Sequence, residues 1–314
     1  MCWRAIGLNP GDEVVFSSHT MVATAAAIHF AGGVPVPVDC GPDHLMDPEA
    51  VERAITPRTR GISPVHLNGR TCQMDKIMAL ADKYHLIVVE DAAQGLGSKF
   101  KGKLAGTFGL AAAFSFYPAK NLGCMGDGGA VITNDEKTAK KISLIRDHGR
   151  NDAGEVEMWG LNSRLDNLQA AILDLQFKDY QSIIERRREF ARIYQKGLGD
   201  IPQLELPPDP DGDEDHFDVF QNYEIEVERR DDLRAFLNEN GIGTIIQWGG
   251  KAVHQFQKLG FRVKLPALDK MLGHFLMLPM NVILINDEVE YIFPRSGNFT
   301  ANRLSIPESW IQLN

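Results

Sequence analysis

Six short apolar segments in the first half of the chain constrain its fold most strongly. They span residues 12–18, 34–39, 60–67, 85–91, 111–117 and 128–135. Their nearly continuous apolar character is typical of strands buried on both faces, as in a mostly parallel sheet. Segments with apolar residues at helical spacing lie between them, at 20–30, 47–55 and 74–84. Asp47 followed by Pro48 marks the start of the second of these helices. This alternation predicts an α/β fold.

The second half of the chain begins with a long amphipathic segment. Residues 163–196 contain neither glycine nor proline and carry apolar residues on one face, which predicts one long helix or two helices in line. The proline-rich, acidic stretch 206–218 predicts a solvated loop. A strand over 221–228 and a helix over 230–240, stopped by Gly241, follow this loop. They predict a small α+β unit.

Length and charge limit the class of protein. The 314 residues suffice for two domains, and we expect a large domain over 1–178 and a small C-terminal domain over 179–314. A formal net charge of −9 and a pI near 5.5 argue against a nucleic-acid partner, which needs a basic face. The sequence has no apolar run of membrane-spanning length and no signal-peptide pattern, so we expect no membrane partner.

The cysteines give a further limit. None of the four forms a CxxC pair, and they are scattered over Cys2, Cys40, Cys72 and Cys124. Such spacing argues against a disulfide framework and against a zinc site, and it fits a reducing compartment. The sequence therefore predicts a cytoplasmic protein without a metal site.

Three features that are close together in the sequence could carry chemistry. The predicted strand 85–91 ends in the carboxylates Glu90 and Asp91, at the end of a strand where open α/β sheets bind ligands. Lys120 follows the next predicted strand, and a glycine-rich stretch follows at 123–131. Each feature has a plainer interpretation: Asp91 as a helix cap and Lys120 as a surface lysine. The glycine stretch matches neither the dinucleotide nor the P-loop spacing.

Taken together, a lysine and a carboxylate at neighbouring strand ends favour one particular chemistry. A lysine amine near an apolar wall has a lowered pKa and can form an imine with an aldehyde. A carboxylate beside a pyridine nitrogen keeps that nitrogen protonated, which makes the ring an electron sink. Pyridoxal 5′-phosphate (PLP) needs both groups. Asp91 and Lys120 are 29 residues apart and could approach one ring from different sides.

The sequence resembles the DegT/DnrJ/EryC1/StrS family of PLP-dependent sugar aminotransferases over residues 4–290. The resemblance rests on "PGDEVVFSSHTMVATAAAI", "VEDAAQGLGSKFKGKLAGTFGLAAAFSFYPAKNLG", "GDGGAVITND" and "LNSRLDNLQAAIL". It implies the PLP-dependent transferase fold of the aspartate aminotransferase type (fold type I). In that fold a large domain with a mostly parallel central sheet is joined to a smaller α+β C-terminal domain.

The resemblance also implies roles for individual residues. Lys120 matches the lysine that holds the cofactor covalently, and Asp91 matches the carboxylate that pairs with the pyridinium nitrogen. Gln94 matches the side chain beside the phenolic oxygen of the ring, and Ser115 matches a hydroxyl that contacts the phosphate. Asn162 matches an amide that reaches the cofactor phosphate of the partner subunit, so a homodimer with shared active sites is implied. A helix N-cap is the alternative role for Asn162.

The resemblance also implies two further groups of site residues, without assigning a separate role to each residue. His19, Thr20 and Met21 lie where the family packs side chains against the cofactor ring, and Met21 occupies a position where an aromatic residue is more usual. The segment 247–256 occupies the place of a His-Tyr-Pro-type loop near the sugar. Trp248 and His254 are therefore substrate-site candidates, although a buried tryptophan serves core packing at least as often.

The resemblance predicts an aminotransferase that moves an amine from glutamate to a nucleotide-linked keto-deoxy sugar. A few relatives carry histidine in place of the lysine and are PLP-dependent sugar dehydratases, but this chain keeps Lys120. The other alternative is an inactive or regulatory relative. It is favoured by the beginning of the chain, because the resemblance places several dozen residues and a phosphate-binding helix N-terminus before Ala5. We therefore expect an N-terminal truncation.

The end of the chain also departs from the family. Relatives continue as a helix after residue 292, whereas this sequence carries the helix breakers Pro294, Gly297 and Pro307. We expect a replaced or frameshifted tail.

Overall fold

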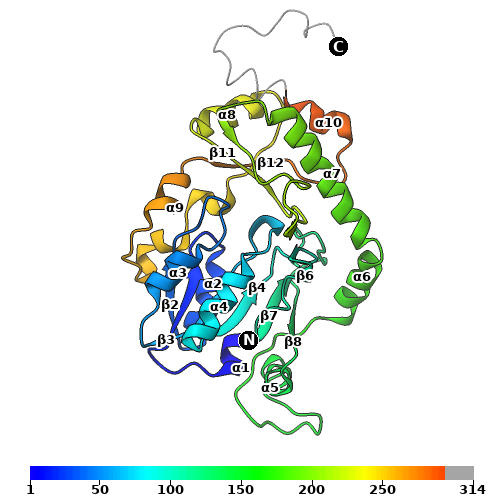
Figure 1. The fold of residues 1–314 in the computed structure, drawn as a ribbon. Coiled ribbons are helices and arrows are strands. Elements are labelled where there is room, and N and C mark those ends of the chain that lie inside the picture. The colour runs from blue at the N-terminus through cyan, green and yellow to red at the C-terminus, as the bar shows by residue number, and fades with distance from the viewer. Residues whose placement is uncertain (294–314) are drawn as a thin grey trace, which may run out of the picture.

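Six strands form a central sheet, one from each of the six predicted apolar segments (Figure 1). The computed structural model describes residues 1–293. The strands are β1 (Glu13–Ser17), β2 (Val34–Val38), β3 (Thr59–Ser63), β4 (Ile87–Asp91), β7 (Ala111–Ser115) and β8 (Gly129–Thr133). Their order is β2-β1-β3-β4-β7-β8, and only β8 runs antiparallel to its neighbour. The predicted mostly parallel sheet is confirmed.

Helices cover both faces of this sheet, because side chains of its inner strands alternate between two apolar clusters. On β1, Val15 contributes to the cluster with α3 and α4, whereas Val14 and Phe16 contribute to the cluster with α1, α2 and α5. The helices are α1 (Cys2–Ile6), α2 (Val22–Phe30), α3 (Pro48–Ala54), α4 (Met74–Tyr84) and α5 (Glu136–Arg146). The Asp47 carboxylate caps α3 by accepting hydrogen bonds from two backbone N–H groups, as predicted.

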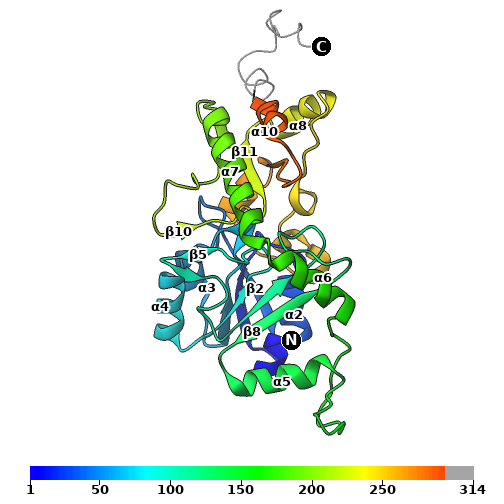
Figure 2. The same cartoon turned by 90° about the vertical axis from the view of Figure 1, so that its right-hand side faces the viewer.

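The predicted long helical segment is two helices, α6 (Asn167–Phe177) and α7 (Tyr180–Leu198), and α7 leads to a second unit (Figure 2). This small unit has an antiparallel sheet in the order β12-β11-β9. It contains β9 (Leu204–Glu205), β11 (Tyr223–Val227), β12 (Phe275–Leu278), α8 (Arg230–Glu239) and α10 (Asn286–Glu290). Its apolar core is separate from the two clusters of the large unit, the part built on the six-stranded sheet. The expected boundary at residue 178 lies between α6 and α7.

Several short elements have no sequence pattern from which they could be predicted. A three-stranded sheet joins β5 (Lys99–Phe100), β6 (Lys103–Leu104) and β10 (His216–Phe217). Helix α9 (Pro266–Met271) and 3₁₀ turns at Leu67–Gly69, Gln247–Gly250, Val253–Gln255 and Gln257–Leu259 complete the described residues. Two-residue strands have no periodicity to detect, which is why they were not expected.

Part of the expected small domain packs on the large unit instead. Val253, Phe256 and Phe261 join the cluster under α1 and α2, and Ala252 packs with Cys40. The expected replaced tail, with Pro294, Gly297 and Pro307, lies outside the described residues. Within residues 1–293, no helix combines the length and the apolar character needed to cross a bilayer.

Candidate active site

Asp91 and Lys120, the two predicted catalytic residues, lie at the same edge of the central sheet. Asp91 is the last residue of β4 and pairs with Ala113 on the parallel strand β7. Lys120 lies in the turn after β7, where its backbone N–H donates to the Tyr117 carbonyl at 2.8 Å. Because β4 and β7 are parallel neighbours, both residues are carried to the carboxyl edge, where open α/β sheets bind ligands.

Glu90, which precedes Asp91, turns to the interior. Its side chain is 0% exposed, and Oε1 accepts hydrogen bonds from the N–H groups of Phe108 and Gly109 at 2.7 Å each. Oε2 accepts from the Gly106 N–H at 2.6 Å and lies 2.8 Å from His66 Nε2. Burial alone would raise the pKa of Glu90, but His66 and these N–H groups lower it below its usual value. Glu90 therefore fixes the turn before β7.

Asp91 has fewer partners and borders a cavity. Its Oδ2 accepts a hydrogen bond from Thr24 Oγ1 at 2.7 Å, and Oδ1 accepts one from the Ala93 N–H at 3.1 Å. A cavity of about 230 Å³ is lined by Asp91, Thr24, Ala93 and Ala113. A turn follows β4 where a helix would be needed, so the helix-cap interpretation of Asp91 is wrong. The carboxylate keeps acceptor capacity for a ligand in the cavity.

The Lys120 ammonium is partly buried and has no hydrogen bond or ion pair within residues 1–293. Burial lowers the pKa of Lys120, and the negative charge of Asp91 partly opposes this effect. A partly buried amine without a partner is costly to keep charged, and such groups are often found at functional sites. Its partial burial disfavours the surface-lysine interpretation. The unpartnered amine and the neighbouring carboxylate suit an aldehyde on a pyridine ring, so these residues fit PLP.

Gln221, which sequence reasoning missed, fixes the loop that carries Lys120. Its Oε1 accepts a hydrogen bond from the Asn121 N–H at 2.9 Å. Its Nε2 donates to the Ala119 carbonyl at 2.8 Å. Both neighbours of Lys120 are thus held by one side chain that comes from the small unit. No local pattern could have identified Gln221, because 100 residues separate it from Asn121.

The remaining predicted cofactor residues from the same edge are Gln94 and Ser115. Gln94 lies in the turn after β4, and its Oε1 accepts a hydrogen bond from the Asn68 N–H at 2.6 Å. Ser115 is the last residue of β7, and its Oγ accepts from the Tyr117 N–H at 3.3 Å. Gln94 is close to Asp91 in the sequence, and Ser115 is close to Lys120. The pairing of β4 with β7 brings these two parts of the chain together in space.

The segment His19–Met21 links β1 to α2, and its three side chains have different surroundings. Thr20 is buried, with its Oγ1 3.0 Å from the hydroxyl of Thr24, which in turn contacts Asp91. His19 is buried as well, its Nε2 3.1 Å from Glu224 Oε1, while its Nδ1 has no hydrogen-bond partner in the described part of the chain. Met21 is 50% exposed at the start of α2.

Asn162 lies apart from this edge, on the surface. It is exposed, and its Oδ1 accepts a hydrogen bond from Arg164 Nε at 3.1 Å. Asp166 occupies the N-cap of α6, so the helix N-cap interpretation of Asn162 is wrong. An open cleft lined by Asn162 runs over β8 and α5. Within residues 1–293, no hydrogen bond or ion pair joins Asn162 to Lys120.

The two substrate candidates, Trp248 and His254, differ in their environment. The half-buried indole ring of Trp248 meets His19 edge-on, with ring centres 5.5 Å apart. His254 is buried, with Nδ1 2.9 Å from Ser18 Oγ and Nε2 3.0 Å from Asp269 Oδ1. Both ring nitrogens of His254 are therefore engaged within the protein.

A cluster of imidazoles and carboxylates joins the two units next to this site. His44 lies 3.5 Å from Glu224 through Nδ1 and 2.8 Å from Glu226 through Nε2. Burial by itself lowers the pKa of His44, but its hydrogen bonds with Glu224 and Glu226 prevail and raise it to about 9. Burial would raise the pKa of Glu224, but His19 and His44 hold it well below its usual range. Asn68 connects this cluster to Gln94, because its Nδ2 donates to Glu224 at 3.1 Å.

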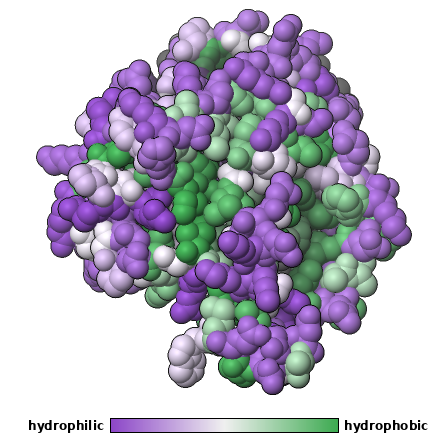
Figure 3. All heavy atoms as spheres, turned by 60° about the horizontal axis from the view of Figure 1, so that its bottom comes forward, coloured by the Kyte–Doolittle hydropathy of each residue, from purple (hydrophilic) through white to green (hydrophobic). Residues whose placement is uncertain are grey.

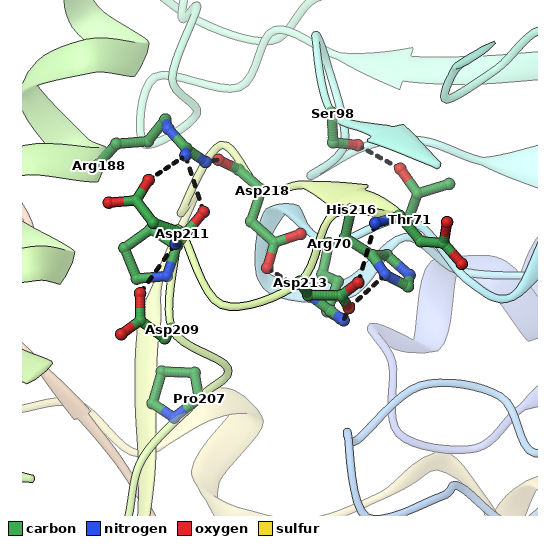
Figure 4. A network of polar contacts seen from close by, with 12 residues as sticks. Arg70, Thr71, Ser98, Arg188, Pro207, Asp209, Asp211, Asp213, His216 and Asp218 are labelled. Atoms are coloured by element: carbon green, nitrogen blue, oxygen red, sulfur yellow. Dashed lines mark hydrogen bonds and ion pairs between the residues drawn. The ribbon is translucent and has the colours of Figure 1, made fainter. Parts of the chain in front are cut away.

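The acidic stretch 206–218 is bound to the protein by arginines, whereas a solvated loop was expected (Figure 4). Arg70 pairs with Asp213 and, at 2.7 Å, with Asp218. Arg188 of α7 pairs with Asp211 at 3.1 Å and donates to the Asp218 carbonyl at 3.0 Å. Asp218 is buried, so this part of the stretch is a structural link between the units.

Comparison with known proteins agrees with this geometry. The sequence model of the DegT/DnrJ/EryC1/StrS aminotransferase family matches residues 1–295. The chain is 40% identical to a pleiotropic regulatory protein of Geobacillus stearothermophilus, over 94% of this chain and 80% of that protein. It is 44% identical to the dTDP-3-amino-3,4,6-trideoxy-alpha-D-glucose transaminase of Streptomyces venezuelae, over 78% of this chain and 64% of that enzyme.

Among solved structures, the fold is similar to that of DesV from S. venezuelae. The TM-score is 0.91 at 37% sequence identity, and the match covers 96% of this chain and 81% of DesV. The predicted fold, an α/β fold of the PLP-dependent aminotransferases with a mostly parallel sheet, is thereby confirmed.

Proposed function

Because the chain belongs to the DegT/DnrJ/EryC1/StrS aminotransferase family, we propose that it transfers an amino group from glutamate to a nucleotide-linked keto-deoxy sugar. The observation that carries the proposal is the pairing of an unpartnered, partly buried Lys120 amine with the Asp91 carboxylate at one sheet edge. The S. venezuelae relative is named as a dTDP-amino-sugar transaminase, which supports a nucleotide sugar as the acceptor. The aminotransferases of this family depend on PLP.

PLP, when bound, supplies an aldehyde that binds amines and a ring that withdraws electrons from the adjacent carbon. Lys120 would hold the cofactor covalently and, once released, would move a proton between carbon atoms at its Nζ. Its lowered pKa favours this role, because more of the amine is unprotonated near neutral pH. Asp91 would keep a proton on the ring nitrogen, while Thr24 and the Ala93 N–H hold the carboxylate in place.

The other residues would position the cofactor and the sugar. Gln94 would lie beside the phenolic oxygen and Ser115 would contact the phosphate, since Gln94 lies in the turn after Asp91 and Ser115 ends the strand that leads to Lys120. Of the three ring-packing candidates, Met21 is the one we propose to lie against the ring. His19 and Thr20 are buried and engaged with Glu224 and Thr24, whereas half of Met21 is exposed.

The substrate roles of Trp248 and His254 stay predictions. Trp248 is the stronger candidate, because its indole is half-buried and lies at the junction of the two units, next to His19. His254 uses both of its ring nitrogens to hold Ser18 and Asp269, so a sugar would have to displace one of these partners.

We also propose a homodimer in which Asn162 reaches the partner's cofactor phosphate. Asn162 is exposed, and so are large apolar side chains in the segment 156–177 that contains it: Val156, Trp159, Leu161, Leu168, Leu175 and Phe177. Trp159 is 94% exposed. Figure 3 shows apolar patches between polar side chains on the lower face of the molecule. Exposed apolar surface of this kind marks association surfaces. Trp159→Glu should shift the sedimentation coefficient to that of a monomer; an unchanged dimer would exclude this surface.

A cytoplasmic location is part of the same proposal. The four cysteines are buried and unpaired, as expected in a reducing compartment.

The test of the function is direct. The purified chain is mixed with PLP and reduced with borohydride, and the peptide that retains the cofactor is identified by mass spectrometry. We expect it to carry Lys120. Unreduced protein is then given glutamate and a series of dTDP- and UDP-linked keto sugars, and amino-sugar formation is measured. Modification of another lysine would refute the assigned role of Lys120. Cofactor attachment without transfer to any acceptor would refute the substrate class, and loss of a sugar hydroxyl instead would indicate a dehydratase.

A further inference from the structure

Three side chains that are far apart in the sequence converge on one point between the two units. His19 comes from the turn after β1, His44 from the turn before α3, and Glu224 from β11. His19 Nε2 lies 3.1 Å and His44 Nδ1 lies 3.5 Å from Glu224 Oε1. The three ligand-type atoms all lie within 4.8 Å of one another.

We propose that His19, His44 and Glu224 bind a divalent transition-metal ion of the Zn²⁺ type. Metal–ligand bonds of about 2.0–2.1 Å in a tetrahedral site separate neighbouring ligand atoms by roughly 3.3 Å. The two spacings around Glu224 Oε1 lie on either side of this value. Two imidazoles and one carboxylate are the protein ligands of many three-ligand zinc sites, which leave a fourth position open.

The surroundings of the three ligands resemble those of metal ligands in known sites. His44 faces Glu226 Oε1 with Nε2 at 2.8 Å, and a carboxylate that holds the outer nitrogen directs the inner nitrogen toward a metal. Glu224 Oε2 accepts a hydrogen bond from Gln247 Nε2 at 2.9 Å, which orients the carboxylate. Nitrogen and oxygen ligands of this kind favour zinc, cobalt, nickel or copper over calcium and magnesium.

Charge and access also favour a cation. Glu224 and Glu226 are alternate residues of β11, so both carboxylates point to the same face of the strand. A divalent ion that displaces the proton of His44 would neutralise the carboxylates of Glu224 and Glu226. His44, Glu224 and Glu226 line a cavity of about 280 Å³ between the units, which gives an ion a path to the site.

The ion would act as a clamp between the units. His19 and His44 belong to the large unit and Glu224 to the small one, so a bound metal would join them at a point that Asn68 links to Gln94. The sequence predicted no metal site because the three ligands have no motif spacing and only one of them was a candidate for any role. The inference is independent of amino transfer, since neither Lys120 nor Asp91 takes part.

Cobalt is the probe we would use, because tetrahedral Co²⁺ has strong visible absorption bands. The full chain is freed of metal with EDTA, dialysed and titrated with CoCl₂ and then with competing ZnCl₂. We expect one equivalent of Co²⁺ with tetrahedral bands, displaced by Zn²⁺. His44→Gln and Glu224→Gln should each weaken binding at least tenfold. His216→Gln is the matched control, because His216 also pairs with a carboxylate, Asp213, but lies outside the cluster. It should bind like the wild type.

Thermal unfolding keeps the test decisive if a variant folds poorly. Zn²⁺ should raise the Tm of the wild type by a few degrees over the EDTA-treated protein, because the ion binds only the folded chain. His44→Gln should lose this difference, and His216→Gln should keep it. Absence of both the cobalt bands and the Tm difference in the wild type would overturn the proposal. Binding that survives both ligand substitutions would overturn it too, and either result would leave the proposed aminotransferase function standing.

Discussion

Glu90 and Asp91 are adjacent carboxylates on the same strand, yet they have opposite surroundings. Glu90 is completely buried and lies within hydrogen-bonding distance of three backbone N–H groups and His66. Asp91 is partly exposed and accepts two hydrogen bonds. Strand geometry causes the difference, because successive side chains of a strand point to opposite faces.

This difference indicates that Glu90 stabilises the fold, whereas Asp91 is available for chemistry. A buried carboxylate whose acceptor sites are filled within the protein has little left to offer a ligand. A carboxylate that keeps free acceptor capacity near an unpartnered amine can bind and polarise a ligand. Substitutions at these two adjacent positions should therefore have effects of different kinds.

The largest effect that we expect is on catalysis by Asp91→Asn. The amide cannot keep a proton on the ring nitrogen, so kcat should fall by about a thousandfold, or roughly 4 kcal/mol of transition-state stabilisation. The Tm should change little, because the amide oxygen can still accept from Thr24 or from the Ala93 N–H. Steady-state kinetics and thermal unfolding measure the two quantities. Near-normal kcat would remove the contrast between Asp91 and Glu90.

Glu90→Gln should have a large effect on stability instead. One amide oxygen cannot replace two carboxylate oxygens toward Gly106, Phe108 and Gly109, and the new NH₂ group faces donors. We expect the free energy of unfolding to fall by about 3 kcal/mol, because one partner of a buried charged network is lost. Urea unfolding of both variants checks this. The contrast fails if Asp91→Asn destabilises the protein as much as Glu90→Gln does.

The smallest effect that we expect is the contribution of Lys120 to the pH dependence of the free energy of unfolding. Its folded-state pKa is lowered by burial, so between that pKa and the unfolded value the unfolded chain binds more protons. The stability contribution of Lys120 must therefore rise with pH over this window. Without cofactor, Lys120→Met should be more stable than the wild type near pH 7. The difference in Tm should shrink toward pH 10, and a difference that widens would contradict the lowered pKa.

The sequence predicted the central sheet well, because buried parallel strands have a strong local signal. Each of the six apolar segments contains a strand. Asp47 caps the helix that begins at Pro48, as the sequence predicted. Lys120 and Asp91 were also identifiable, since their strands end close together along the chain. The resemblance to a known family then implied a specific role for each residue, and these roles stay predictions.

The rest depends on contacts between distant segments, for which one sequence has no signal. Gln221 holds the Lys120 loop from the small unit, and Asn68 connects Gln94 to Glu224. The acidic stretch 206–218 has the composition of a solvated loop, but Arg70 and Arg188 bind it. Ion pairs of this kind cannot be predicted from one sequence, because the arginines lie near the acidic stretch only in the folded chain.

The position of Gln221 also has a consequence for the synthesis of the chain. The large sheet and Lys120 leave the ribosome well before residue 221, so the nascent large unit contains Lys120 but lacks the side chain that fixes both neighbours of that lysine. The loop has no such support until the start of the small unit emerges and docks. In a growing chain the backbone on both sides of Lys120 is therefore fixed only after residue 221 has been made, so the candidate site cannot be complete before the small unit begins to fold.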